Sequence, residues 1–280
     1  MEQLYISMLD KYSKLLILLF FIILGFFLYS SQNFKLDASS DTLILEKDED
    51  LKKYRKVIKD YGSNDFLIVT FSDQTRIITQ KNLENIKLFI NNVEQLDWVE
   101  NIQSIFDVPL LEVNDQNLTD LVNQILTIES PGVNILDAEN ELIKSPIFKN
   151  LIISEDATST GVLINFKRDR EFDRIVNERT RLLDLENNTS INRSYKNAIE
   201  TEYEEIKKNF DNSRHENIRE IRSIIKTFDK SGLTIHLGGV SMIADDTISF
   251  VKNDIIVFGI GVFIFILIVL FIVFKKFTWM

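Results

Sequence analysis

Two long apolar runs near the ends of the chain dominate its hydrophobic pattern. Ile255 to Phe274 contains eighteen Ile, Val, Leu or Phe and two Gly, without any charge. A helix of twenty residues rises about 30 Å, which matches the hydrocarbon core of a bilayer. Leu15 to Tyr29 is equally apolar. We therefore predict transmembrane helices at 15–31 and 255–274, which place residues 32–254 together on one side of a membrane.

Each run has an alternative interpretation. Lys11 and Lys14 before the first run also resemble the start of a signal peptide, but the bulky Tyr29 stands where cleavage requires a small residue. An uncleaved anchor is therefore favoured. The second run could be a buried core helix. Its apolar residues each contribute about -0.3 to -0.6 kcal/mol to membrane insertion, with no polar residue opposing them, and this favours a span.

Between the runs, the apolar spacing alternates between the periods of helices and strands. Spacings of three and four predict helices over 83–96, 171–186 and 195–230. Short β-branched or aromatic runs predict strands at 66–71, 98–106, 162–166 and 233–237. With helices 83–96 and 195–230, these strands give the ferredoxin-like order β-α-β-β-α-β. The sequence thus predicts an α+β fold, a ferredoxin-like extracytoplasmic domain with helical insertions, flanked by two transmembrane helices.

Less regular segments surround this pattern. Asp48 to Gly62 is predicted to be an amphipathic helix with acidic residues at its start and a glycine at its end. All three prolines fall in 107–146, which indicates an irregular insert with one helix near 118–128. Residues 151–153 are predicted to pair with 162–166 through a polar hairpin loop. Residues 241–254 are expected to be helical and to run into the second span.

One polar segment interrupts the longest predicted helix. Residues 211–217 (DNSRHEN) contain no apolar side chain, and the apolar stripes before and after them do not share a phase. Either the helix shifts its register here, or it breaks into an antiparallel pair. The sequence leaves both possibilities open.

The charge of the chain is concentrated between the spans. The net charge is -10, and residues 32–254 hold 28 Lys/Arg against 40 Asp/Glu. This acidic segment repels phosphate backbones and anionic headgroups, which argues against nucleic-acid binding and peripheral membrane binding. Lysines near the spans fall mainly on the side of the termini, namely Lys11, Lys14, Lys275 and Lys276 against Lys35 and Lys252.

This bias predicts the orientation. We expect a multi-pass protein of the inner (plasma) membrane with cytoplasmic segments 1–14 and 275–280 and a periplasmic or extracellular domain 32–254. Without cysteine, neither disulfides nor thiolate metal ligands are available.

Residues that could support chemistry are few. His215 is expected to be solvated in a polar helix break, and His236 to point off a strand, since neither has metal-ligand spacing. No nucleophile elbow, P-loop or dinucleotide fingerprint occurs, so we expect no enzyme activity, no cofactor and no catalytic or metal site. Neither apolar run contains the ionisable residue that an intramembrane proton relay needs.

Four aspartates gather where the chain meets the predicted membrane surface: Asp37, Asp41, Asp245 and Asp246. They could form a vestibule for a cation or a polar substrate. The favoured interpretation is structural, because Asp41 can cap a turn while Asp245 and Asp246 solvate a helix near its N-terminus, where negative charge is favourable.

Two motifs resemble the MmpL-like exporters of the RND superfamily. FKLDASSDTLILEKDEDLKKYRKVIKDYGSNDFLIVTFS, at 34–72, resembles the segment after their first span, and GGVSMIADDTISFVKNDI, at 238–255, resembles the segment before their second. The resemblance implies proton-driven export of lipidic or amphiphilic substrates, with 32–254 as the porter domain. It places the protonatable residues of the family on the fourth span of each half, to which no position of this sequence corresponds.

We therefore expect an N-terminal part of an exporter, with Met280 lying where a third span should begin. Its partners would be the bilayer, the missing spans or a companion subunit, and a hydrophobic or amphiphilic substrate. The alternative is a membrane-anchored ligand-binding or sensor module. The six residues after the second run offer such a receptor little means of passing a signal inward.

Overall fold

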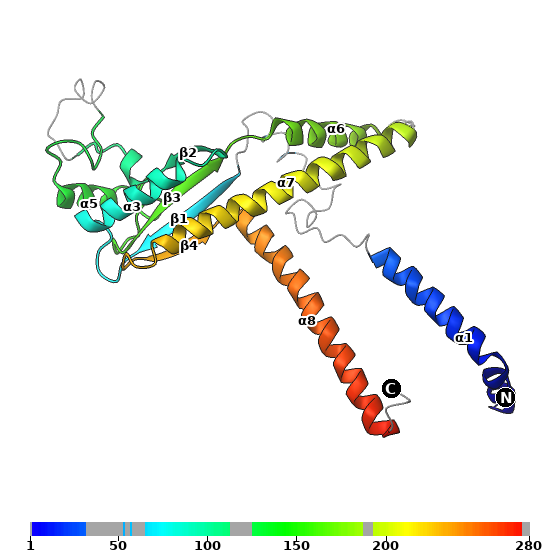
Figure 1. The fold of residues 1–280 in the computed structure, drawn as a ribbon. Coiled ribbons are helices and arrows are strands. Elements are labelled where there is room, and N and C mark those ends of the chain that lie inside the picture. The colour runs from blue at the N-terminus through cyan, green and yellow to red at the C-terminus, as the bar shows by residue number, and fades with distance from the viewer. Residues whose placement is uncertain are drawn as a thin grey trace.

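The computed structural model describes residues 2–31, 53, 57, 65–112, 125–186 and 193–275. In these residues the chain forms an α+β structure with a four-stranded antiparallel sheet and six α-helices (Figure 1). In chain order the elements are α1 (Glu2–Ser31), β1 (Phe66–Ser72), α3 (Gln80–Val93), β2 (Val99–Gln103), the 3-10 turn η2 (Ile105–Asp107), α5 (Ile135–Lys144), β3 (Ser159–Phe166), α6 (Arg170–Glu186), α7 (Arg193–Thr227), β4 (Thr234–Gly238) and α8 (Val240–Phe274).

The sheet has the strand order β2-β3-β1-β4, and each neighbouring pair is antiparallel. Alternate residues of the central strands point to one face, as a half-buried strand requires. On β1 these residues are Leu67, Val69 and Phe71, and all three are fully buried. The register sets Val69 opposite Val162 and Leu67 opposite Ile164, so both central strands contribute to one core.

Two helices cover this face of the sheet. The ring of Phe89 on α3 lies edge-on to Phe71, with 5.2 Å between the centroids, and edge-on to Phe228, which follows α7, at 5.7 Å. Ile218 and Ile221 of α7 are fully buried in the same core. The helices α3 and α7 therefore pack side by side over the strands, and the predicted elements 66–71, 83–96, 162–166 and 233–237 are confirmed with small shifts at their ends.

The predicted strand 98–106 is shorter than expected. It ends at Gln103 because Ser104 and Asp107 form a capping box around η2. The Ser104 amide donates to the Asp107 carboxylate at 2.8 Å, and the Phe106 amide donates to the Ser104 hydroxyl at 3.2 Å. These local bonds satisfy backbone groups that would otherwise continue the strand.

The helix predicted near 118–128 is wrong in the part that the structure describes. Residues 125–128 are not helical, and Leu126 instead forms an isolated bridge with Leu110. The helix of this insert is α5, which begins where the Asn134 side chain accepts the amide of Leu136 at 2.9 Å. Residues 118–124 lie outside the described part of the chain, as does the predicted helix 48–62 apart from Lys53 and Val57.

The predicted hairpin between 151–153 and 162–166 is confirmed only in part. Residues 151–152 form a turn, but Ile153 makes an isolated antiparallel bridge with Thr160. The amide of Gly161 also donates to the carbonyl of Ile152 at 3.3 Å. The pairing stays short because β2 occupies this side of β3 at 163–166.

The long helix α7 resolves the ambiguity at 211–217. It is a single helix of 35 residues, so the stripe shifts in phase without a break. In its first half Ile199 packs on Ile175 and Leu182 of α6, whereas in its second half Ile218 and Ile221 pack on the sheet. The apolar stripe of α7 changes phase because the first half of the helix packs on α6 and the second half packs on the sheet. The pair formed by α6 and the first half of α7 extends beyond the sheet (Figure 1).

Among the described residues, one helix is long and apolar enough to cross a membrane. It covers Val240–Val273, within α8, and none of its most apolar window is buried. Within the described residues, 255–274 therefore do not form a buried core helix. Helix α1 contains a shorter apolar stretch, Ile17–Phe27, inside the predicted span 15–31.

Candidate functional site

The start of α8 is fixed against the edge of the sheet by a glycine. Gly239 has a φ of 125° and is the N-cap of α8. A Cβ atom at this position would lie 2.7 Å from the carbonyl oxygen of Phe66 on β1. Only glycine tolerates both the backbone angle and the close approach. The chain can therefore turn directly from β4 into α8.

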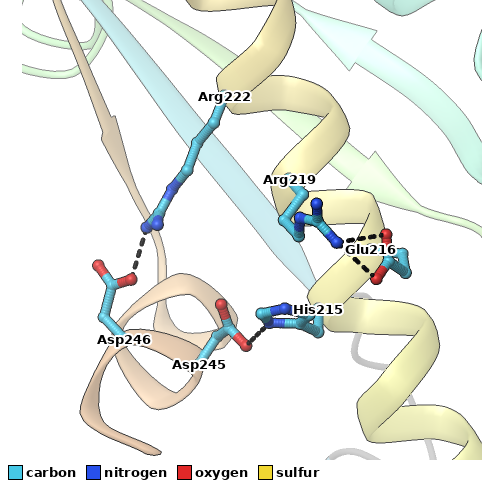
Figure 2. Close-up of polar contacts among 6 residues, drawn as sticks. All are labelled: His215, Glu216, Arg219, Arg222, Asp245 and Asp246. Atoms are coloured by element: carbon cyan, nitrogen blue, oxygen red, sulfur yellow. Dashed lines mark hydrogen bonds and ion pairs between the residues drawn. The ribbon is translucent and has the colours of Figure 1, made fainter. Parts of the chain in front are cut away.

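Helix α8 is then bonded to α7 through two polar contacts, which we call the α7–α8 clasp. His215 Nδ1 lies 2.7 Å from Asp245 Oδ1, and Arg222 Nη2 lies 2.7 Å from Asp246 Oδ1. Figure 2 shows both contacts bridging the two helices. His215 and Arg222 are seven residues apart, which places them two turns apart on one face of α7.

The two aspartates are partly buried by this contact. The side chain of Asp245 is 15% exposed and that of Asp246 is 26% exposed. The nearby pair of Arg219 and Glu216 differs, because it lies within α7 and both side chains are more than 60% exposed. The clasp thus joins α7 to α8, whereas the Arg219–Glu216 pair lies on the exposed surface of α7.

These positions correct two expectations from the sequence. Asp245 and Asp246 do not solvate an exposed helix face, and His215 is bonded to α8 instead of lying in a solvated break. His236 is exposed on β4, as predicted. Asp37 and Asp41 lie outside the described residues. The vestibule interpretation is weakened, because two of its four carboxylates already have partners within the protein.

A second contact of the same polar segment joins α7 to the sheet. The guanidinium carbon of Arg214 lies 3.8 Å from the centroid of the Phe166 ring and 4.7 Å from that of Phe210. Its Nε lies 3.3 Å from the carboxylate of Asp65. Burial lowers the pKa of Arg214, and the negative charges of Asp65 and Asp169 oppose that shift.

Sequence reasoning missed both contacts because it treated DNSRHEN as a solvated interruption. A signal was present, since His215 and Arg222 share a helix face and two adjacent aspartates precede the apolar run. These residues can be paired only if α7 and α8 are known to be neighbours. The two helices are neighbours because β4, which lies between them in the chain, is hydrogen-bonded to β1.

Comparison with protein families matches the same part of the chain. Residues 206–280 match the MMPL family. This match covers 75 of the 280 residues and supports an RND/MmpL-like protein. No curated protein sequence matches it. The matched region begins within α7 and includes the clasp, β4 and the apolar helix α8. The match supports a membrane transporter of the RND/MmpL kind, and the clasp holds the described helix that is long and apolar enough to cross a membrane.

Proposed function

We propose that this chain provides the first span, the outer domain and the second span of an RND/MmpL-type exporter of lipidic or amphiphilic substrates. The observation that carries the proposal is the MMPL match over 206–280, because this region joins a folded domain to a membrane-length apolar helix. In the complete transporter, proton movement would drive export. The outer domain would guide the substrate on its side of the inner membrane.

The topology of the sheet supports a porter domain of the ferredoxin-like class. Along the chain the elements β1, α3, β2, β3, α7 and β4 follow the split β-α-β order. The all-antiparallel arrangement β2-β3-β1-β4 keeps the two helices on one face. The helices α5 and α6 are the helical insertions of this domain.

The proposal includes dependence on further spans. Residues 255–274 carry no ionisable side chain, and the resemblance assigns proton coupling to a span with no counterpart in these 280 residues. We propose that further spans, or a companion subunit, supply this coupling. Residues 1–280 would then bind substrate without converting a proton gradient into transport.

The absence of cysteine makes the proposed arrangement directly testable. A single introduced thiol is the only one in the chain, so labelling with a membrane-impermeant maleimide reports on one position. We expect Asp229→Cys, which is exposed beyond α7, to react in intact cells. Lys14→Cys should react only after the cells are permeabilised. Labelling of Lys14→Cys in intact cells, or protection of Asp229→Cys, would contradict the arrangement.

Transport by the chain alone tests the dependence on partners. The full chain is placed in proteoliposomes with a fluorescent phospholipid and an imposed pH gradient. We expect no gradient-driven movement of the lipid, and such movement would overturn the incomplete-exporter hypothesis. The sensor alternative makes a different prediction, namely that a small polar ligand raises the melting temperature of the full chain.

A further inference from the structure

A basic cleft lies where β2 and β3 meet the start of α6. Its volume is about 680 Å³. Its charged lining consists of Lys167, Arg168, Arg170, Arg174, Glu100 and Asp173. Four cations against two carboxylates give a local excess of positive charge on a chain whose net charge is -10. This reversal of sign distinguishes the basic cleft from the acidic domain around it.

Internal contacts neutralise only part of this charge. Arg168 pairs with Asp173, and Arg174 pairs with Glu202. The ammonium group of Lys167 donates to the backbone carbonyl of Asp97, which holds the side chain in place without cancelling its charge. Neither Lys167 nor Arg170 forms an ion pair with another residue that the structure describes.

Backbone hydrogen bonds and a ring contact hold the residues around the basic cleft in place. The amide of Lys167 donates to the carbonyl of Trp98 at 2.8 Å, and the Trp98 ring packs on Phe166 with 4.8 Å between the centroids. Asp169 accepts the amides of Glu171 and Phe172, so it already caps the start of α6. The attraction for an anion therefore comes from the basic side chains.

We propose that the basic cleft binds an anionic head group, a phosphate or a carboxylate, through Lys167 and Arg170. Arginine forms paired hydrogen bonds with both groups, and lysine adds a compact positive charge. The volume is in the range of small-ligand sites. The site goes beyond the proposed export function and does not depend on it, since it requires only the charges and geometry of the outer domain.

Tryptophan fluorescence of the full chain tests the site. The chain has two tryptophans, so Trp279→Phe leaves Trp98, which lies beside Lys167, as the reporter. The protein is placed in phosphatidylcholine nanodiscs and titrated with inorganic phosphate and with glycerol 3-phosphate. We expect a saturable change that Lys167→Gln with Arg170→Gln weakens by at least about tenfold. The matched control is Arg219→Gln with Lys226→Gln, which removes the same charges from exposed positions on α7.

The lipid composition then separates two sources of the anion. If phosphatidylglycerol nanodiscs block the titration, the site takes a lipid head group from the membrane. If the titration persists there, the site takes a soluble anion. The proposal is overturned if phosphate and glycerol 3-phosphate both leave Trp98 unchanged, or if the cleft variant and the control variant titrate alike. Neither result would affect the labelling pattern that tests the exporter arrangement.

Discussion

The guanidinium of Arg222 on α7 lies 2.7 Å from the carboxylate of Asp246 on α8, and this contact joins the sheet-packed part of the chain to its most apolar helix. Arg222 lies within the single helix α7. Asp246 lies within the single helix α8, which continues without a break into the apolar stretch. The first turns of α8 therefore pack with the sheet and α7, whereas its later turns form the apolar stretch.

Breaking the clasp should lower the stability of the α7–α8 contact. Because both side chains are partly exposed, we expect Arg222→Gln or Asp246→Asn to cost roughly 0.5–1 kcal/mol. The double variant should cost less than the sum, since both changes remove the same ion pair. Thermal unfolding of the full chain measures each value. Arg219→Gln is the control, and a cost equal to that of Arg222→Gln would contradict the distinction between the two pairs.

Replacing Gly239 should disturb the entry into α8. Gly239→Ala places a Cβ 2.7 Å from the Phe66 carbonyl at a backbone angle that alanine avoids. We expect a loss of about 1–3 kcal/mol, measured by thermal unfolding. Gly161→Ala, on β3, is the matched control because nothing lies within 4 Å of its added Cβ. Equal melting temperatures for the two variants would refute the role of the close contact.

Arg214 should resist replacement even by lysine. Its planar group stacks between Phe166 and Phe210 and also faces Asp65, and a lysine keeps the charge but not the flat contact. We expect Arg214→Ala to lose about 1–3 kcal/mol and Arg214→Lys to lose an intermediate amount. Urea unfolding compares the two. A lysine variant as stable as the parent chain would show that the charge alone matters.

Acid should weaken the turn after β1 through Asp73. The amide of Thr75 and the side chain of Asn82 donate to its carboxylate at 2.9 and 3.0 Å, and these bonds lower the pKa of Asp73. A lowered pKa means that this stabilisation is present above the ordinary aspartate range and is lost as the pH falls through the lowered value.

The measurement is the melting temperature as the pH falls below about 4. Asp73→Asn removes the titrating group, so its melting temperature should fall less steeply with acid than that of the parent chain. Other carboxylates titrate in both proteins and cancel in the comparison. Identical slopes would rule out this contribution.

The sequence was sufficient for elements whose pattern is local. β1 alternates buried residues, and α3 repeats them at helical spacing, so both could be placed before the structure was known. Residues 151–153 are as apolar as a strand, but they pair with β3 only through Ile153, because β2 occupies the same side of β3 at 163–166. That condition is set by distant parts of the chain.

The polar contacts of α7 show the same limit for the candidate site. Asp245 is 30 residues from His215, and Asp65 is far earlier than Arg214 in the chain. No spacing rule connects such partners. The charge of each residue could be read from the sequence, but its partner could not. His215, Asp245 and Asp246 were therefore expected to be solvated.

The uninterrupted course of α8 determines how movement of its apolar part would reach the sheet. The helix has 35 residues, which corresponds to a rod of about 52 Å. Between Val240 and Phe258 it contains neither glycine nor proline, so it has no hinge at which to bend. Its N-terminal end is held by Gly239 and the clasp. If α8 crosses a membrane, a tilt of 240–258 would therefore move the sheet with it, and this part of α8 would act as a lever.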